Sequence, residues 1–130
     1  MNSNNLEKQK EKVLIFFKEE KFEDVIVAGE KLLKQTQNDT QLIFILGLAS
    51  INIQNFSNAE NYFRRLVSFK RNAENLYTLA NIQKKLKKFN QAIISYEEAI
   101  KLSKRDTRRY VKRQFTWFAH NYIPYKIINV

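Results

Sequence analysis

The residues that most often carry catalysis or bind metals are scarce in this chain. His120 is the only histidine and there is no cysteine, so a zinc site built from several His or Cys side chains cannot be assembled. The only glycines are Gly29 and Gly47, which cannot form a glycine-rich phosphate loop. We therefore predict a protein that is not an enzyme and that has no metal site and no cofactor.

The other residues whose chemistry could matter are the cations, which outnumber the acidic residues. The 23 Lys and Arg residues exceed the 13 Asp and Glu residues, which gives a net charge of +10. Residues 1–102 carry +4 and residues 103–130 carry +6. A dense group of lysines comprises Lys84, Lys85, Lys87 and Lys88. Such a group can contact phosphate or an acidic partner, although a solvated face is the commoner explanation, and A/T-rich codon usage also enriches Lys.

The elements that position these residues are expected to be helices. Two glycines and one proline are too few turn-forming residues for a β-sandwich or barrel. The hydrophobic fraction of 44% is that of a globular protein. The longest apolar run, residues 42–51, is half of the about 20 residues that a membrane span needs. We therefore expect an all-α protein, cytoplasmic and without a membrane contact.

An internal repeat of 33 to 34 residues organises the chain. Each copy carries an aromatic residue followed three positions later by a small or β-branched one: Phe22 and Val25, Phe56 and Ala59, Phe89 and Ala92. This pattern resembles the tetratricopeptide repeat, a helix–turn–helix unit of 34 residues. The resemblance implies a short right-handed solenoid of about three units, over residues 6–39, 40–72 and 73–106. A generic helical bundle is the alternative.

The three copies depart from the family pattern at a few positions. Glu20, Gln54 and Lys87 stand where the turn between helices A and B usually has Gly. Lys12 replaces an apolar residue in the first copy. Gly47, in contrast, fits the pattern, because it stands where helix A must approach helix B closely. An exposed Lys12 suits a terminal repeat that faces solvent on one side.

The resemblance also implies a concave surface lined by helix A of each repeat, on which a peptide or helix of another protein binds. The matching positions are Lys10, Leu14 and Phe17, then Phe44, Leu48 and Ile51, then Tyr77, Asn81 and Lys84. The middle of this surface is apolar, as interaction sites often are. Two other occupants remain open: the C-terminal segment of the same chain, or a second copy in a homodimer.

The repeat pattern stops after Leu102, and the following segment is strongly basic. Residues 106–118, DTRRYVKRQFTWF, resemble the C-terminal signature of bacterial tRNA dimethylallyltransferase, with Val111 in place of the usual Ala. The resemblance implies a basic helix that engages tRNA. The residues available for phosphate contact are Arg108, Arg109, Lys112 and Arg113, and Trp117 could stack on a base. The enzyme's phosphate loop has no counterpart here.

Three interpretations of this segment remain open. It binds tRNA, or it caps the last repeat through Phe115, Trp117 and Phe118, or it is the end of an unrelated gene in a chimeric reading frame. Read as a helix, the segment has an apolar stripe of Val111, Phe115 and Phe118. We therefore divide the chain into a repeat domain, residues 6–102, and a basic C-terminal helix and tail, residues 103–130. The main hypothesis is a non-catalytic module that binds a protein or peptide. The alternative is a tRNA-binding accessory, or a truncated or fused remnant of a tRNA dimethylallyltransferase.

Overall fold

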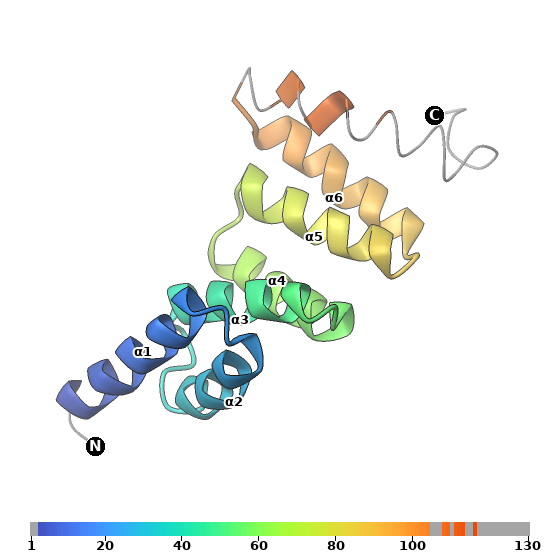
Figure 1. Ribbon diagram of the computed structural model, residues 1–130. Coiled ribbons are helices and arrows are strands. Elements are labelled where there is room, and N and C mark those ends of the chain that lie inside the picture. Colours follow the sequence, from blue (N-terminus) through green and yellow to red (C-terminus); the bar gives the residue numbers. More distant parts are fainter. Residues whose placement is uncertain (1–2, 105–107, 110, 114–115, 117–130) are drawn as a thin grey trace. The chain divides into compact units, whose positions relative to one another are not determined.

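The computed structural model describes residues 3–104, 108–109, 111–113 and 116, and these residues form helices and turns without any strand. The prediction of an all-α fold of helix–turn–helix units is confirmed. Consecutive helices pack in pairs, α1 with α2, α3 with α4 and α5 with α6. Their bounds are α1 Ser3–Lys18, α2 Phe22–Leu33, α3 Thr40–Asn52, α4 Phe56–Phe69, α5 Ala73–Lys85 and α6 Phe89–Leu102 (Figure 1).

The chain divides into two compact units, Met1–Phe69 and Lys70–Val130. The first unit contains α1 to α4, and within it α2 also packs against α3 while α1 touches α3. The second unit contains α5, α6 and the helical residues 108–109, 111–113 and 116. None of the helices among the described residues is long and apolar enough to cross a membrane.

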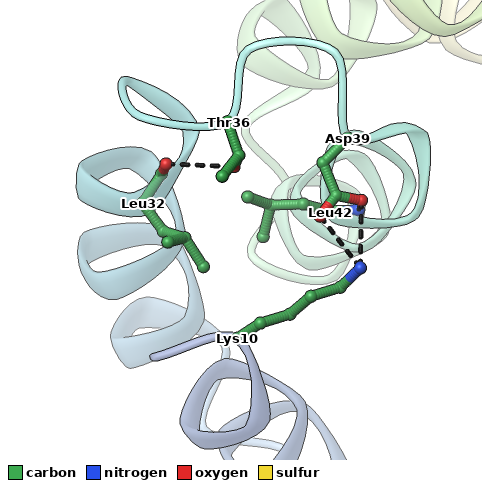
Figure 2. Close-up of polar contacts among 5 residues, drawn as sticks. All are labelled: Lys10, Leu32, Thr36, Asp39 and Leu42. Atoms are coloured by element: carbon green, nitrogen blue, oxygen red, sulfur yellow. Dashed lines mark hydrogen bonds and ion pairs between the residues drawn. The ribbon is translucent and has the colours of Figure 1, made fainter. Parts of the chain in front are cut away.

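Polar side chains start the first helix of the second and third repeats. Asp39 caps α3 by accepting a hydrogen bond from the backbone N–H of Leu42 at 3.1 Å. Asn72 caps α5 in the same way and accepts from the N–H of Asn75. Lys10 reaches from α1 to Asp39, with 2.9 Å between Nζ and Oδ2, so this carboxylate also ties α1 to the start of α3 (Figure 2). Each cap satisfies a backbone donor that the helix itself leaves free.

The turn inside each helical pair has the same backbone geometry. In the second repeat, the N–H of Gln54 donates to the carbonyl of Ile51, and the N–H of Asn55 donates to the carbonyl of Ser50. This pair of bonds is the Schellman motif, which needs a left-handed residue after the helix. The left-handed residues are Glu20 (φ 58°), Gln54 (φ 62°) and Lys87 (φ 62°). These are the positions where the repeat pattern led us to expect glycine.

The core of the first unit depends on close approach at two glycines. A Cβ on Gly47 of α3 would lie 2.6 Å from a ring carbon of Phe63, which is fully buried in α4. A Cβ on Gly29 of α2 would lie 2.7 Å from a methyl carbon of Leu46 in α3. The absence of a side chain at these positions therefore lets α3 pack tightly against both α4 and α2.

The second unit is centred on Tyr96, which is completely buried in α6. Its ring packs edge-on against Tyr77 of α5, and its hydroxyl donates to the side-chain oxygen of Asn81. A second buried bond joins the two helices, from the Ser95 hydroxyl to Gln83 Oε1 at 2.7 Å. These bonds satisfy the polar groups that the pairing of α5 with α6 buries.

Candidate functional site

The predicted binding surface divides between the two units. Residues 10, 14 and 17 share one face of α1, and residues 44, 48 and 51 share one face of α3, because each set is spaced by four and then three positions. Both sets lie in the first unit, where α1 touches α3. Leu14, Leu48 and Ile51 are half-buried, as expected for side chains on such a face. Tyr77, Asn81 and Lys84 lie in the second unit.

Two of the predicted aromatic residues are already engaged within the first unit. Phe44 is 39% exposed, but its ring packs edge-on against Phe63 with 6.0 Å between the centroids. Phe17 packs edge-on against Phe22 at 5.8 Å, across the turn between α1 and α2. Both rings therefore also contribute to the packing within the first unit.

The three predicted residues of α5 differ in how they are held. The rings of Tyr77 and Tyr96 lie 5.8 Å apart, and Asn81 accepts the hydrogen bond from Tyr96. Both side chains therefore help to pair α5 with α6. Lys84 is half-buried, and burial, followed by the charge of Lys85, lowers its pKa. The last turn of α5 thus holds two ammonium groups close to one another.

The basic residues after α6 are exposed and flank a buried anchor in sequence. We call Arg108, Arg109, Lys112 and Arg113 the C-terminal cluster, and all four are exposed. Val111 lies between them in sequence and is only 1% exposed, so its side chain anchors this segment by packing against the rest of the protein. The Arg108 guanidinium donates to the Ser103 carbonyl at 3.2 Å, which adds a second attachment. Trp117, Phe115 and Phe118 lie outside the described residues.

The sequence did not indicate a shallow hollow of about 440 Å³ in the first unit, lined by Glu30, Leu33, Lys34, Gln37 and Arg65. Two of these residues, Lys34 and Gln37, lie in the segment between α2 and α3, where the sequence has no helical periodicity from which a hollow could be predicted. The nearby Tyr62 hydroxyl donates to Glu30 Oε1 at 2.8 Å, and burial, with this bond next, raises the Tyr62 pKa. The described part of the chain contains no group of three or more His, Cys, Asp or Glu that could hold a metal ion.

Two family models match the chain. The tetratricopeptide-repeat model matches residues 40–72. The IPP transferase model matches residues 57–121, half of the chain, and so extends upstream of the 106–118 segment through α5 and α6.

The curated relatives that match are tRNA dimethylallyltransferases. The enzyme of Clostridioides difficile is 54% identical over 35 residues, which are 27% of this chain and 11% of the enzyme. That of Methylorubrum extorquens is 70% identical over 27 residues, which are 21% and 8% of the two chains. Geotalea daltonii tRNA dimethylallyltransferase 2 is 51% identical over 39 residues, 30% of this chain and 12% of the enzyme. This chain therefore spans about a tenth of the length of these relatives.

Solved structures match over most of the chain. The type III secretion translocator chaperone SycD of Yersinia enterocolitica is 14% identical and has a TM-score of 0.71, covering 89% of this chain and 91% of SycD. PcrH, solved in complex with the chaperone binding region of PopB, is 12% identical with a TM-score of 0.71, covering 90% and 96%. At these identities the likeness concerns the fold. The chain belongs to the IPP transferase family through residues 57–121, and it folds as a tetratricopeptide-repeat protein.

Proposed function

We propose that the chain is a non-catalytic protein-binding module whose first unit holds a peptide or helix of a partner protein on the face formed by α1 and α3. The observation that carries the proposal is the row of half-buried apolar side chains Leu14, Leu48 and Ile51. A half-buried leucine gains further burial when a partner covers it, at about 25 cal/mol per Å² of apolar area. The partner is therefore a segment with apolar side chains at spacings that match this face.

The similar fold of PcrH supports this proposal. In that structure PcrH is in complex with the chaperone binding region of PopB, a segment of a partner protein. We extend the same class of ligand to this chain, with contacts made by its own residues. Lys10 and Asp39 pair at one border of the face, which gives the apolar row a polar rim where a partner's backbone can form hydrogen bonds.

A capture experiment tests this function. The purified chain serves as bait, and the captured proteins are identified and then compared between wild type, Leu48→Asp and Val27→Asp. Val27 is 66% exposed on α2, so its variant is a matched control for an added charge on an apolar surface residue. We expect Leu48→Asp to lose the partner and Val27→Asp to keep it, with equal helical circular dichroism. Equal capture by both variants would mean that the partner does not bind on the α1–α3 face.

Two other occupants of the face, a second copy or the chain's own C-terminal segment, can be distinguished by further measurements. If a second copy covers α1 and α3, light scattering gives a dimer for wild type and a monomer for Leu48→Asp. If the chain's own C-terminal segment covers them, deletion of residues 117–130 increases hydrogen exchange in α3. In either case the face is an internal or homodimeric contact, and the proposed capture of another protein is wrong.

A second candidate function is the binding of tRNA through the C-terminal cluster. The match to IPP transferases over residues 57–121 and the exposure of all four cations favour it. Dimethylallyl transfer itself is disfavoured, because the chain has only two glycines and no phosphate loop. A gel shift with tRNA, using wild type and a chain lacking residues 103–130, tests this candidate. Equal binding by both chains would show that residues 103–130 do not contribute to tRNA binding.

A further inference from the structure

The net charge of the chain is confined to one of its two structural units. Residues 1–69 hold nine basic and nine acidic residues, whereas residues 70–130 hold 14 basic and four acidic residues. The first unit is therefore neutral, and the second carries the entire +10. Codon bias toward lysine acts on the whole chain, so it does not explain why the excess begins at the boundary between the units.

Part of this excess lies at the end of α5 and in the turn that leads to α6. We call Lys84, Lys85, Lys87 and Lys88 the turn cluster, and no Asp or Glu occurs anywhere between residues 75 and 96. The corresponding turns of the other repeats differ, because residues 18–21 read KEEK and residues 52–55 read NIQN. The repeat architecture itself therefore does not require cations at this turn.

The helix dipoles explain only half of the turn cluster. Lys84 and Lys85 end α5, where the dipole favours positive charge. Lys87 and Lys88 immediately precede α6, whose first turn has no acidic residue, and there the dipole disfavours positive charge. Lys85, Lys87 and Lys88 are exposed, while the lowered pKa of Lys84 reflects its burial and the neighbouring charge. An anion bound at this turn would offset the unfavourable effects of the α6 dipole and of the neighbouring positive charges.

The two clusters of the second unit suit a long polyanion. The turn cluster precedes the 14 residues of α6 and the C-terminal cluster follows them, and a helix of that length rises about 20 Å. A single carboxylate or phosphate cannot reach both ends, whereas a nucleic acid carries charges at short, regular intervals along its backbone. We infer that the turn cluster is a second contact for an RNA phosphate backbone, separate from the C-terminal cluster. This inference rests on the second candidate function and adds a site to it.

Fluorescence anisotropy with a labelled oligouridine of about 20 nucleotides tests the inference on the full chain. The turn variant is Lys85→Gln/Lys87→Gln/Lys88→Gln, which leaves the half-buried Lys84 in place. The charge-matched control replaces Lys8, Lys18 and Lys34, three exposed lysines of the neutral unit, by Gln. We expect the turn variant to weaken binding at least about tenfold and to reduce the slope of log K against log salt by about 2, while the control changes neither.

Four results would overturn the inference. Equal losses in the turn variant and the control would mean that only overall charge matters. Competition by polyglutamate as effective as competition by unlabelled oligouridine would identify an acidic protein as the partner class. A third variant, Arg108→Gln/Arg109→Gln/Lys112→Gln, separates the two proposals: if it loses RNA and the turn variant does not, the turn contact is wrong and tail binding stands. If wild type binds neither oligouridine nor tRNA, both proposals fail.

Discussion

Replacing Gln54 by glycine should stabilise the protein, although glycine usually destabilises. Gln54 has a φ of 62°, a left-handed conformation that costs a residue with a Cβ about 1 to 2 kcal/mol. Glycine removes this cost but loses about 0.5 to 1 kcal/mol more conformational entropy on folding. The difference predicts that Gln54→Gly raises the free energy of unfolding by about 0.5 to 1 kcal/mol. The two backbone bonds of the turn do not involve the Gln54 side chain.

Urea unfolding followed by far-ultraviolet circular dichroism measures this difference. Asn61→Gly is the matched control, because Asn61 is exposed inside α4 and glycine there should lower the free energy of unfolding. Gln54→Ala retains a Cβ and should stay within about 0.5 kcal/mol of wild type. If Gln54→Gly destabilises the protein as much as Asn61→Gly does, the turn is not left-handed and the repeat geometry described above is wrong.

Three further predictions concern the first unit. Gly47→Ala should lower the free energy of unfolding more than Gly29→Ala does. Both variants gain about 1 kcal/mol of helix propensity. The new Cβ at residue 47, however, meets the buried Phe63 ring at 2.6 Å, whereas the one at residue 29 meets a leucine methyl. Chemical unfolding of the two variants compares them. Tyr62→Phe should cost about 0.5 to 1 kcal/mol at pH 7, measured the same way, because it removes the bond to Glu30. Since the raised Tyr62 pKa keeps this phenol protonated in the folded state, wild type should lose more stability than Tyr62→Phe as pH rises above about 10, and equal losses would contradict the pKa shift.

Features that recur at equivalent positions of the three repeats could be predicted from the sequence. Glu20, Gln54 and Lys87 align at one position of the pattern, and the structure shows the left-handed conformation at all three. Gly47 marked the close approach of helix A to helix B, and the Phe63 ring occupies that contact. Val111 marked the apolar side of the C-terminal segment, and it is buried. Each of these depends on spacing within one or two neighbouring elements.

Features that depend on contacts between distant residues could not be predicted in this way. The pairing of Lys10 with Asp39 joins residues 29 positions apart, and no pattern in the sequence connects them. The sequence also did not indicate that the Phe44 ring packs against Phe63, although this ring keeps an exposed edge on the predicted surface. The boundary after Phe69 is defined by the contacts of the folded chain, so the sequence alone does not show it. From the sequence we divided the net charge at residue 103, which left +4 in the first part. Divided at the boundary between the structural units, the first part has a net charge of zero.

The family match and the fold describe the same residues in different terms. Residues 57–121 match the IPP transferase model, yet α5 and α6 within that range form a helical pair of the repeat fold. One chain therefore combines a neutral unit that presents apolar residues with a basic unit that presents cations. We propose that these units serve different ligands, a protein segment and a polyanion.

The affinity of the α1–α3 face for a peptide tests the central proposal most directly. A peptide is selected against the wild-type chain from a displayed library, labelled, and titrated with wild type, Leu48→Asp and Val27→Asp. We predict that Leu48→Asp raises the Kd at least about tenfold, as expected for a charge placed in an apolar contact, while Val27→Asp leaves the Kd unchanged. An unchanged Kd for Leu48→Asp, with both variants folded by circular dichroism, would contradict the account.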